Sequence, residues 1–476
     1  MGNTSQASVR IKSLLDENSF VEIGGLITAR ATDFNMEPKE TPADGVITGY
    51  GLIDGNLVYV YSQDASVMGG SVGEMHAKKI VNLYDFALKM GAPVIGLLDS
   101  AGLRLQEATD ALNGFGEIFR KQALASGVIP QITAVFGNCG GGLALFPTMT
   151  DFTFMEGKKA KLFVNSPNAL DGNVESKNDT ASARFQSAQS GIVDVVADEA
   201  DMFVKIRQLV AMLPANNEEN GSYDECTDDL NRAGAGLANC VGDTAAALAQ
   251  ISDNNIYFEM KADYAKEMTV GFIRLNGMTV GAVANRTEVT GADGKAAEKF
   301  DALLTPNGCM KAAEFIGFCD AFDIPVLSLT NVKGFAATIE AEKEIAKASA
   351  KLTYAFANAT VPKVNIIIGQ AYGSAYVAMN SKAIGADLTL AWDSASIGMM
   401  DAQLAAKIMY EGKGAEVIGE KAAAYKELQT STASAARRGY VDQIISPADT
   451  RKYVIGAFEM LFTKREEHPN KKHGTI

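Results

Sequence analysis

Two amphipathic stretches, each followed by a short apolar run, set the pattern of this chain. Lys78–Met90 and Lys311–Phe322 carry apolar residues at helical spacing. The runs VIGLL and VLSL follow them, directly after Pro93 and Pro325. A helix that ends before a proline and leads into a fully apolar run is typical of an α/β unit with a buried strand. The pattern therefore predicts two such units.

The two units lie 232 residues apart, and a second pair of segments keeps the same offset. VIPQITAVFGNCGGGLAL begins at Val128 and TVPKVNIIIGQAYGSAYV begins at Thr360, so that Gly137 aligns with Gly369. A fixed offset over distant segments is the signature of an internal repeat. The chain is therefore expected to be duplicated.

Each half also begins with a hairpin signal. Asp54-Gly55 lies within GLIDGNLVYVYSQ and Asn276-Gly277 within GFIRLNGMTVGAVAN. Upstream, FVEIGG near Phe20 matches YFEMKA near Tyr257. With helices and strands alternating after each hairpin, we expect a mainly parallel sheet in each half and an α/β fold class.

The chain length of 476 residues fits two large domains. PANNEENGSYDECTDDLNRAGAG, from Pro214, is rich in Asn, Glu, Asp and Gly and is expected to be a linker. Its carboxylates from Glu218 to Asp229 lack ligand-like spacing, so a solvated linker is favoured over a metal site. The expected domains are residues 1–235 and 236–476.

Composition narrows the function classes. The net charge of −14 disfavours nucleic acid as a partner. No apolar run approaches the ~18 residues of a membrane span, so a cytoplasmic location is expected. Five cysteines without CxxC spacing indicate reduced, mostly buried thiols and no structural zinc, and no metal is expected. Of the three histidines, His468 and His473 lie in the polar C-terminal tail, and His76 is expected on a helix surface, which argues against a histidine-based triad.

Three successive glycines, Gly140, Gly141 and Gly142, follow the apolar strand QITAVF. Without Cβ atoms, the backbone N–H groups of this turn can approach a ligand closely, at the positive end of a following helix. A tight connection needed only for packing is the alternative. A nucleotide loop is disfavoured, because neither GxxxxGK[ST] nor a dinucleotide fingerprint is present. The functional hypothesis is an oxyanion site made of backbone amides.

The aligned turn of the second half, GQAYGSAYVAM, follows the strand VNIII. Gly373 aligns with Gly141 and Ser374 with Gly142, and Ala375 follows. Two such turns in register favour a shared function over packing alone. The candidate catalytic residues are Gly141, Gly142, Ser374 and Ala375, with Gly140 and Gly373 beside them.

Two further glycine segments are candidate binding sites. DSAGLRLQEA supplies Ala101, Gly102, Leu103 and Arg104 at the carboxyl end of a strand, where ligands collect. The side chain of Arg104 either meets a phosphate or pairs with Glu107, and the pairing is slightly favoured. Gly69 and Gly70 precede a helix and are suited to admit the pantetheine arm of a ligand.

SQDASVMGGSVGEMHAKKI, GAPVIGLLDSAGLRLQEA, ASGVIPQITAVFGNCGGGLALFPTMTDFTFM and AYGSAYVAMNSKAIGAD together resemble the carboxyltransferase subunit of biotin-dependent acyl-CoA carboxylases and decarboxylases. The resemblance runs from about residue 11 to about residue 451. It implies two tandem crotonase-like domains, the first binding acyl-CoA and the second biotin.

The resemblance also implies an activity and partners. A carboxyl group would move between biotin and the α-carbon of a short acyl-CoA thioester, with the first turn holding the thioester enolate and the second the biotin enolate. The partners would be a biotin carboxyl carrier protein, a biotin carboxylase or a membrane decarboxylase subunit, and further copies of the chain in a homo-oligomer, expected to be a hexamer. The active site would form between the first domain of one subunit and the second domain of another.

Several positions depart from the family pattern or bear on substrate choice. Val377 lies where the family carries Asp or an aliphatic residue that helps to select the acyl chain, and core packing explains it equally well. Residues 332–335 read VKGF and lead into a helix without the family's paired glycines and basic His/Arg, Asp401 replaces a glycine, and Asn165–Gly191 lacks a glycine-rich stretch. The alternatives are a noncatalytic structural paralogue and a biotin-independent crotonase-like enzyme acting on acyl-CoA.

Overall fold

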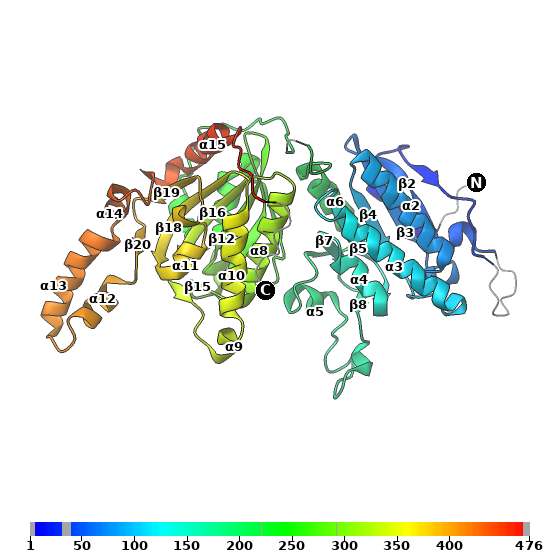
Figure 1. The fold of residues 1–476 in the computed structure, drawn as a ribbon, viewed down its shortest axis with the longest axis horizontal. Coiled ribbons are helices and arrows are strands. Elements are labelled where there is room, and N and C mark those ends of the chain that lie inside the picture. The colour runs from blue at the N-terminus through cyan, green and yellow to red at the C-terminus, as the bar shows by residue number, and fades with distance from the viewer. Residues whose placement is uncertain (1–4, 31–39, 220, 292, 470–476) are drawn as a thin grey trace. The chain divides into compact units, whose positions relative to one another are not determined.

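The computed structural model describes residues 5–30, 40–219, 221–291 and 293–469. The chain forms two compact units, Met1–Ser222 and Tyr223–Ile476, and each is described by itself (Figure 1). Both are built from a central sheet and helices, so the α/β fold class is confirmed. His473 lies outside the described residues.

The first unit contains a seven-stranded sheet in the order β1-β2-β3-β4-β5-β7-β9. The strands β1, β2 and β3 are antiparallel and the rest of the sheet is parallel. The helices α2 and α3 cover one face of it (Figure 1). The strands are β1 (Val21–Ile23), β2 (Val46–Ile53), β3 (Asn56–Gln63), β4 (Val94–Leu98), β5 (Gln131–Val135), β7 (Phe152–Glu156) and β9 (Val195–Ala197), with β6 (Asn138–Gly140) and β8 (Lys161–Phe163) paired separately. The helices are α1 (Gln6–Leu14), α2 (Glu74–Met90), α3 (Ala108–Ala125), α4 (Leu145–Thr148), α5 (Ala183–Ala188) and α6 (Glu199–Met212), with the short 3-10 helices η1 (Pro42–Gly45), η2 (Met68–Gly70), η3 (Leu105–Glu107), η4 (Gly141–Ala144) and η5 (Pro167–Ala169).

The second unit repeats this plan. Its main sheet runs β10-β11-β12-β16-β18-β19-β21, again antiparallel up to the third strand and parallel beyond it. The strands are β10 (Tyr257–Met260), β11 (Met268–Leu275), β12 (Met278–Asn285), β13 (Glu288–Thr290), β14 (Ala296–Lys299), β15 (Leu303–Leu304), β16 (Val326–Val332), β17 (Gly334–Phe335), β18 (Lys363–Tyr372), β19 (Leu388–Trp392), β20 (Ser396–Gly398) and β21 (Gln443–Ile445). The helices are α7 (Thr244–Ile251), α8 (Pro306–Ala321), α9 (Ile339–Glu342), α10 (Ile345–Asn358), α11 (Gly373–Ala378), α12 (Ala402–Met409), α13 (Ala415–Tyr425), α14 (Thr432–Arg437) and α15 (Thr450–Leu461), with the short helices η6 (Leu237–Cys240), η7 (Asp253–Asn255), η8 (Lys382–Ile384), η9 (Lys426–Thr430) and η10 (Pro447–Asp449).

Both expected hairpins are present and have the same turn geometry. The φ angles are +48° and +80° at Asp54-Gly55, and +50° and +78° at Asn276-Gly277. Positive φ at both central residues matches the right-handed twist of the flanking strands. In each unit one aspartate accepts from both amides of the turn: Asp16 at 3.1 and 2.9 Å, and Asp253 at 3.2 and 2.7 Å. The duplication thus extends to the polar contacts that close each hairpin.

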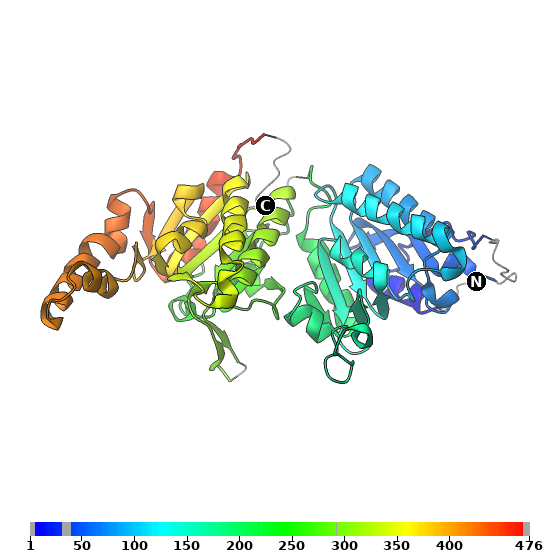
Figure 2. The same ribbon diagram turned by 60° about the horizontal axis from the view of Figure 1, so that its bottom comes forward.

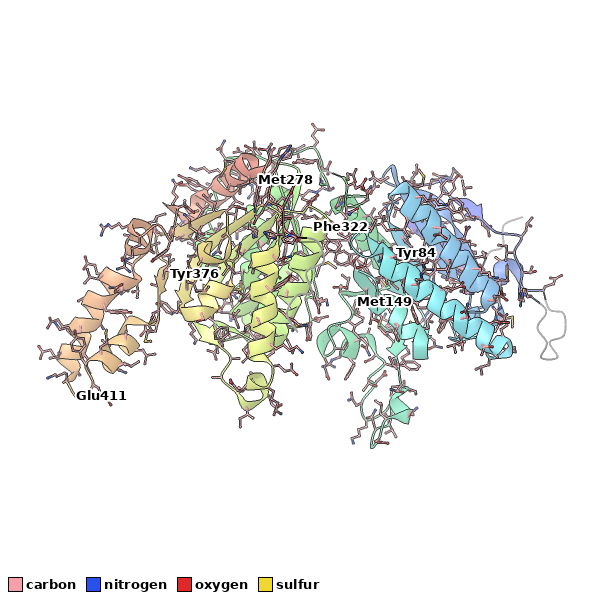
Figure 3. All side chains as sticks on the ribbon, in the orientation of Figure 1. Tyr84, Met149, Met278, Phe322, Tyr376 and Glu411 are labelled. Atoms are coloured by element: carbon pink, nitrogen blue, oxygen red, sulfur yellow. The ribbon has the colours of Figure 1, made fainter. Side chains whose placement is uncertain are left out.

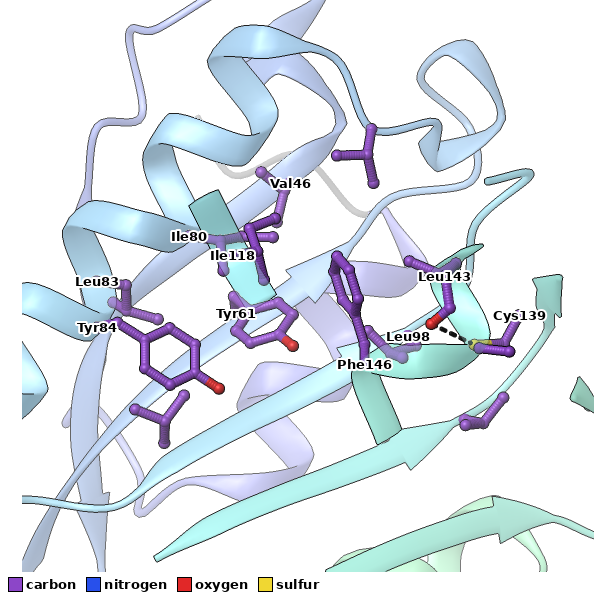
Figure 4. Close-up of a cluster of buried hydrophobic side chains, with 14 of the residues drawn as sticks. Val46, Tyr61, Ile80, Leu83, Tyr84, Leu98, Ile118, Cys139, Leu143 and Phe146 are labelled. Carbon is purple, nitrogen blue, oxygen red and sulfur yellow. Dashed lines mark hydrogen bonds between the residues drawn. The ribbon is translucent and has the colours of Figure 1, made fainter. Parts of the chain in front are cut away.

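The hydrophobic core of the first unit reaches the glycine turn. Leu98, Phe146, Cys139 and Leu143 are buried in one cluster (Figure 4). The Cys139 thiol donates to the Leu143 carbonyl at 3.5 Å, across the turn between them (Figure 4). Buried residues on both sides thus hold the three glycines at the edge of the sheet.

The helix prediction around Lys78–Met90 is confirmed, but the expectation for His76 is wrong. The helix α2 begins at Glu74, and the His76 side chain is fully buried. Its ring nitrogens lie 3.0 Å from the Asp44 carbonyl and 3.3 Å from Gln63 Nε2. Burial lowers the pKa of His76 to about 3, so the ring is neutral at physiological pH.

The polar segment after Pro214 is largely exposed, as expected for a solvated linker, but part of it is anchored to the second unit. The two compact units divide at Ser222 and Tyr223, before the expected residue 235, because the following residues pack on the second unit. Tyr223 bridges to Met278, and Arg232 binds Asp228 at 2.9 Å. At least one of the clustered acids is therefore a structural ion-pair partner.

A helical extension leaves the sheet of the second unit after β20. The helices α12 and α13 project away from the sheet, and Glu411 marks the turn between them (Figures 2 and 3). Asp401, the unexpected acid in this segment, caps α12 by accepting from the amides of Gln403 and Leu404 at 3.0 and 3.1 Å. Among the described residues, no helix has the length and apolar character needed to cross a membrane.

Candidate active site

The first glycine turn lies where β6 passes into η4. Gly140 is extended, and Gly141 begins the helix with a φ of +63°. The amides of the first helical residues have no acceptor within the helix, and they carry the positive end of its dipole. Gly142 is exposed and Gly141 half-buried, so the turn lies at the protein surface.

Each of these glycines is required for its own reason. A Cβ on Gly140 would come within 2.7 Å of the Phe163 ring, and one on Gly142 within 3.2 Å of the Phe115 ring. A Cβ on Gly141 would meet nothing within 4 Å, so only its positive φ demands glycine. The turn is therefore limited to glycine by two aromatic rings and by one positive φ angle.

The structure brings the other glycine segments of the first unit to this turn. The Ala101 amide donates to the Gly69 carbonyl at 2.8 Å, and the Ser100 amide donates to the Asn138 carbonyl at 3.0 Å. A Cβ on Gly102 would lie 3.6 Å from the Gly140 carbonyl oxygen.

Gly70 and Leu103 belong to the same group of segments. The Ser100 hydroxyl donates to the Gly70 carbonyl at 2.6 Å, and Leu103 forms a parallel bridge with Val72. Three segments that are distant in sequence therefore meet at one edge of the sheet.

Arg104 differs from the other candidate residues of these segments. Its side chain is fully buried, and its guanidinium donates to Asp44 at 2.6 Å and to Glu107 at 2.8 Å. The pairing with Glu107 is confirmed, and the expectation that Arg104 binds a phosphate of a ligand is wrong, because the guanidinium has no access to solvent. Asp44, 60 positions away, was missed, since nothing in the sequence pattern links it to Arg104.

The second glycine turn has the same backbone geometry. Gly373 begins α11 with a φ of +62°, and a Cβ there would lie 3.3 Å from the Met399 carbonyl oxygen. Ser374 is exposed and Ala375 is buried, in the order that Gly142 and Leu143 show in the first unit. The amides of Gly373, Ser374 and Ala375 are again the first of a helix.

Val377 lies on α11 one turn beyond Gly373, with 38% of its surface exposed. Its neighbour Tyr376 is half-buried, and burial raises the pKa of the Tyr376 hydroxyl to about 12.

The side chains that lie against Gly140 and Gly142, and those of the neighbouring Leu143 and Cys139, supply no acid or base at neutral pH. Phe115, Phe163 and Leu143 carry no ionisable group, and burial raises the pKa of the Cys139 thiol far above its usual range. All five cysteines are free thiols. Within the described part of the chain, no group of three or more His, Cys, Asp or Glu side chains is placed to hold a metal ion. The turn can thus act through its amide donors.

In each unit a glycine turn at the edge of a mixed sheet leads into a short helix, and the first amides of such a helix are suited to bind an anionic oxygen. The carboxyl transferase domain family matches residues 3–476. The chain therefore belongs to the carboxyl transferase family, and it is an enzyme.

The relatives agree with this assignment. The chain is 39% identical to the propionyl-CoA carboxylase beta chain of Roseobacter denitrificans, covering 99% of this chain and 93% of the relative. It is also 39% identical to the methylmalonyl-CoA decarboxylase subunit alpha of Propionigenium modestum, covering 99% and 92%.

Among solved structures, the hexameric transcarboxylase 12S with hydrolysed methylmalonyl-coenzyme A bound matches with a TM-score of 0.92 and 38% identity. The match covers 98% of this chain and 92% of that one. The chain is a carboxyltransferase of the type found in these three enzymes.

Proposed function

We propose that this carboxyltransferase moves a carboxyl group between biotin, attached to a carrier protein, and the α-carbon of a short acyl-CoA thioester. The observation that carries the proposal is the repeated turn: Gly141 and Gly373 begin helices with φ angles of +63° and +62°, at equivalent places in the two units. Two ligands that each develop charge on a carbonyl oxygen need two such amide sites.

Each unit is assigned one ligand, in a tandem of crotonase-like domains. The first unit binds acyl-CoA and the second binds biotin, which corresponds to the expected domains 1–235 and 236–476 with the boundary moved to Ser222. The duplicated strand order supports a common domain type.

At the acyl-CoA site, the amides of Gly141 and Gly142 donate to the thioester carbonyl oxygen. Their hydrogen bonds strengthen as the α-carbon gains or loses a carboxyl group and charge builds on that oxygen. One donor of this kind contributes about 3–4 kcal/mol to transition-state stabilisation. Gly69, Gly70, Ala101, Gly102 and Leu103 line the path of the pantetheine arm, because the structure brings their backbones to the turn.

At the second site, the amides of Ser374 and Ala375 donate to the ureido carbonyl oxygen of biotin. Biotin supplies a nitrogen that carries the carboxyl group and, once that group has left, accepts or returns a proton. The residues fit this group, because Ser374 is exposed at a helix N-terminus and Gly373 keeps the approach free of a Cβ.

Val377 is proposed to limit the length of the acyl chain. Its exposed apolar surface lies one turn from the second site, and the relatives named above act on propionyl-CoA and methylmalonyl-CoA. A three-carbon acyl group, linear or branched by the added carboxyl, is therefore the proposed substrate.

The proposed partners follow from the same relatives. They are a biotin carboxyl carrier protein, a biotin carboxylase or a membrane decarboxylase subunit, and further copies of this chain. The transcarboxylase 12S structure is a hexamer, which supports a hexamer here, with each active site completed by a second subunit.

The test is a carboxyl-exchange assay with purified protein, methylmalonyl-CoA and free biotin or a biotinylated carrier. We expect propionyl-CoA to form only when biotin is present, and avidin to stop the reaction. Turnover that persists with avidin and without carrier would instead identify a biotin-independent decarboxylase. No exchange with any short acyl-CoA would refute the proposal in favour of a noncatalytic paralogue.

A further inference from the structure

The guanidinium of Arg104 lies at the centre of a buried polar network in the first unit. Nη1 donates to Asp44 Oδ1 at 2.6 Å and to Glu107 Oε1 at 2.8 Å. Nη2 donates to the Ser71 carbonyl at 2.7 Å, and Nε donates to the Ser71 hydroxyl at 3.3 Å. Asp44, Ser71, Arg104 and Glu107 are called the Arg104 network below. The side chains of Arg104 and Asp44 have no exposed surface, and that of Glu107 is 2% exposed.

Both carboxylates of the network also cap the helix α2. Glu107 Oε2 accepts from the Glu74 amide at 2.5 Å, and Asp44 Oδ2 accepts from the His76 amide at 2.8 Å. A Cβ on Gly73 would lie 2.5 Å from both Arg104 Nη1 and Glu107 Oε2. The residue that caps α2 must therefore be glycine to leave room for the ion pair. Two carboxylates at a helix N-terminus, with an arginine between them, make a satisfied and rigid cluster.

The network is joined to the proposed acyl-CoA site through the backbone. Ser71 directly follows Gly70, and Arg104 directly follows Leu103. The Val72 amide donates to the Gly102 carbonyl at 2.8 Å, and the Arg104 amide donates to the Val72 carbonyl at 3.0 Å. The guanidinium therefore fixes two glycine segments against each other, one residue away from the positions assigned to the ligand.

The second unit keeps the backbone pairing and lacks the network. The strands β15 and β17 pair in parallel, with Leu304 opposite Phe335, and the Ala336 amide donates to the Leu304 carbonyl at 2.8 Å. At the offset of 232, Ala336 replaces Arg104 and Ile339 replaces Glu107, and Ile339 is 83% exposed. The fold therefore forms this pairing without an ion network.

A buried lysine that binds backbone carbonyls is, unlike the Arg104 network, present in both units. Lys79 on α2 donates to the carbonyls of Ala43 and Val46, and Lys311, 232 positions later on α8, donates to those of Lys261 and Tyr264. The buried lysine belongs to the common plan of the fold. The Arg104 network is an addition specific to the unit that is assigned acyl-CoA.

We propose that Arg104 is a positioning residue for acyl-CoA, which acts through the backbone and touches no ligand. It holds the Gly69–Gly70 and Ala101–Leu103 segments at the separation that the pantetheine arm and thioester require. Burying these charges brings little net stability compared with an apolar core of the same shape. What the network provides is therefore a fixed geometry of the two segments. The inference rests on the proposed assignment of acyl-CoA to the first unit.

The test uses the full-length protein with Arg104→Lys, which keeps the charge and loses the planar fork. We expect the Kd for propionyl-CoA, measured by calorimetry, and the KM for methylmalonyl-CoA to rise about 10- to 100-fold, while the KM for free biotin stays within about 2-fold. Arg207→Lys is the control for the same substitution at a more exposed arginine of the same unit. Arg207 also binds two carboxylates, Asp16 and Asp54, and a carbonyl, Leu14, but at the hairpin end of the unit, and its variant is expected to bind propionyl-CoA normally.

A second variant covers the case in which Arg104→Lys does not fold. The triple variant Asp44→Asn/Arg104→Met/Glu107→Gln removes the charges together, so no carboxylate is left buried without a partner. It is expected to keep the oligomer and the biotin KM and to lose propionyl-CoA affinity.

Unchanged Kd in a folded variant, or equal rises in the KM for both substrates, would overturn the inference, as would wild-type protein that binds no acyl-CoA. Wild-type protein that binds propionyl-CoA without exchanging carboxyl would refute only the proposed function. In that case the Kd comparison still decides the role of Arg104.

Discussion

Gly137 lies directly against the carboxylate of Asp99, so that a Cβ on Gly137 would overlap Oδ1. Asp99 is held there by Arg10, whose guanidinium donates to it at 2.9 Å. The second unit shows the same contact at the offset of 232, where a Cβ on Gly369 would lie 2.5 Å from Asn331 Oδ1. In both units the chain thus approaches the glycine turn through a position that only glycine fits.

Gly137→Ala is expected to lower the free energy of unfolding by about 1–3 kcal/mol, because the new methyl group displaces a fixed carboxylate. In an Asp99→Ala background the same substitution should cost much less, because the overlapping group is gone. Urea unfolding of the four proteins measures the coupling. Gly116→Ala, where a Cβ meets nothing within 4 Å, is the control and should be neutral or slightly stabilising. Equal costs of Gly137→Ala in both backgrounds would contradict the argument.

Gly141→Val should abolish carboxyl exchange with little more loss of stability than Gly172→Val. Both glycines have positive φ, +63° and +71°, and at both a Cβ would meet nothing within 4 Å, so a β-branched residue forces the same backbone change. Only at Gly141 does that change move the amide donors, and a loss of about 100-fold or more in kcat is expected. Exchange assays and thermal unfolding on both variants provide the comparison. Normal turnover in folded Gly141→Val would remove the first turn from the mechanism.

The arginines of the two hairpins should differ in their effect on stability. Arg451 binds Asp253 at 2.6 Å with 2% of its side chain exposed, while Arg207 binds Asp16 at 2.8 Å with 26% exposed. Arg451→Met leaves the buried Asp253 without its cationic partner, although the two hairpin amides remain, and should cost about 3–5 kcal/mol. Arg207→Met should cost about 1 kcal/mol or less, because water replaces the lost contact. Denaturant unfolding measures both losses of stability. Similar losses in the two variants would show that burial of the arginine does not determine its contribution.

Lys311 should make stability depend on pH in the alkaline range. Burial lowers its pKa to about 8 from an ordinary value of 10.5. As the pH falls from 10.5 to 8, Lys311 of the unfolded chain takes up a proton that Lys311 of the folded chain does not. The contribution of Lys311 to the free energy of unfolding is therefore highest above pH 10.5 and declines toward pH 8. The decline is on the order of 3 kcal/mol.

The measurement is the free energy of unfolding of the wild type minus that of Lys311→Met, taken from pH 7 to pH 10.5. The difference should rise above pH 8 and be flat below it, since the hydrogen bonds lost in the variant add only a constant. A difference that does not change with pH would show that the buried ammonium keeps its ordinary pKa.

The sequence was sufficient for the repeated parts of this protein. The offset of 232 predicted that Gly141 and Gly373 are equivalent, and the structure gives them nearly the same φ. Asn-Gly and Asp-Gly pairs predicted both hairpins, because this turn geometry demands residues that tolerate positive φ. Local chemistry and periodicity were enough for these features.

The sequence pattern did not predict the contacts between distant segments. The sequence offered Glu107 as a partner of Arg104 because it lies three positions away, whereas Asp44 lies 60 positions away and no period connects them. His76 is buried because the turn of η1, which is distant in sequence from α2, covers this part of the helix, and the Asp44 carbonyl binds the ring. In the same way, Asp228 belongs to a charged stretch and still finds Arg232 and Arg451.

Each unit carries its own sheet, its own core and its own hairpin closed by an aspartate and an arginine. Among the described residues, the main sheet of each unit is built only from strands of that unit. A gene cut between the codons for Ser222 and Tyr223 would therefore separate the chain without interrupting either sheet. Co-expression of such halves would allow the proposed acyl-CoA side and the proposed biotin side to be exchanged independently between enzymes of different substrate preference.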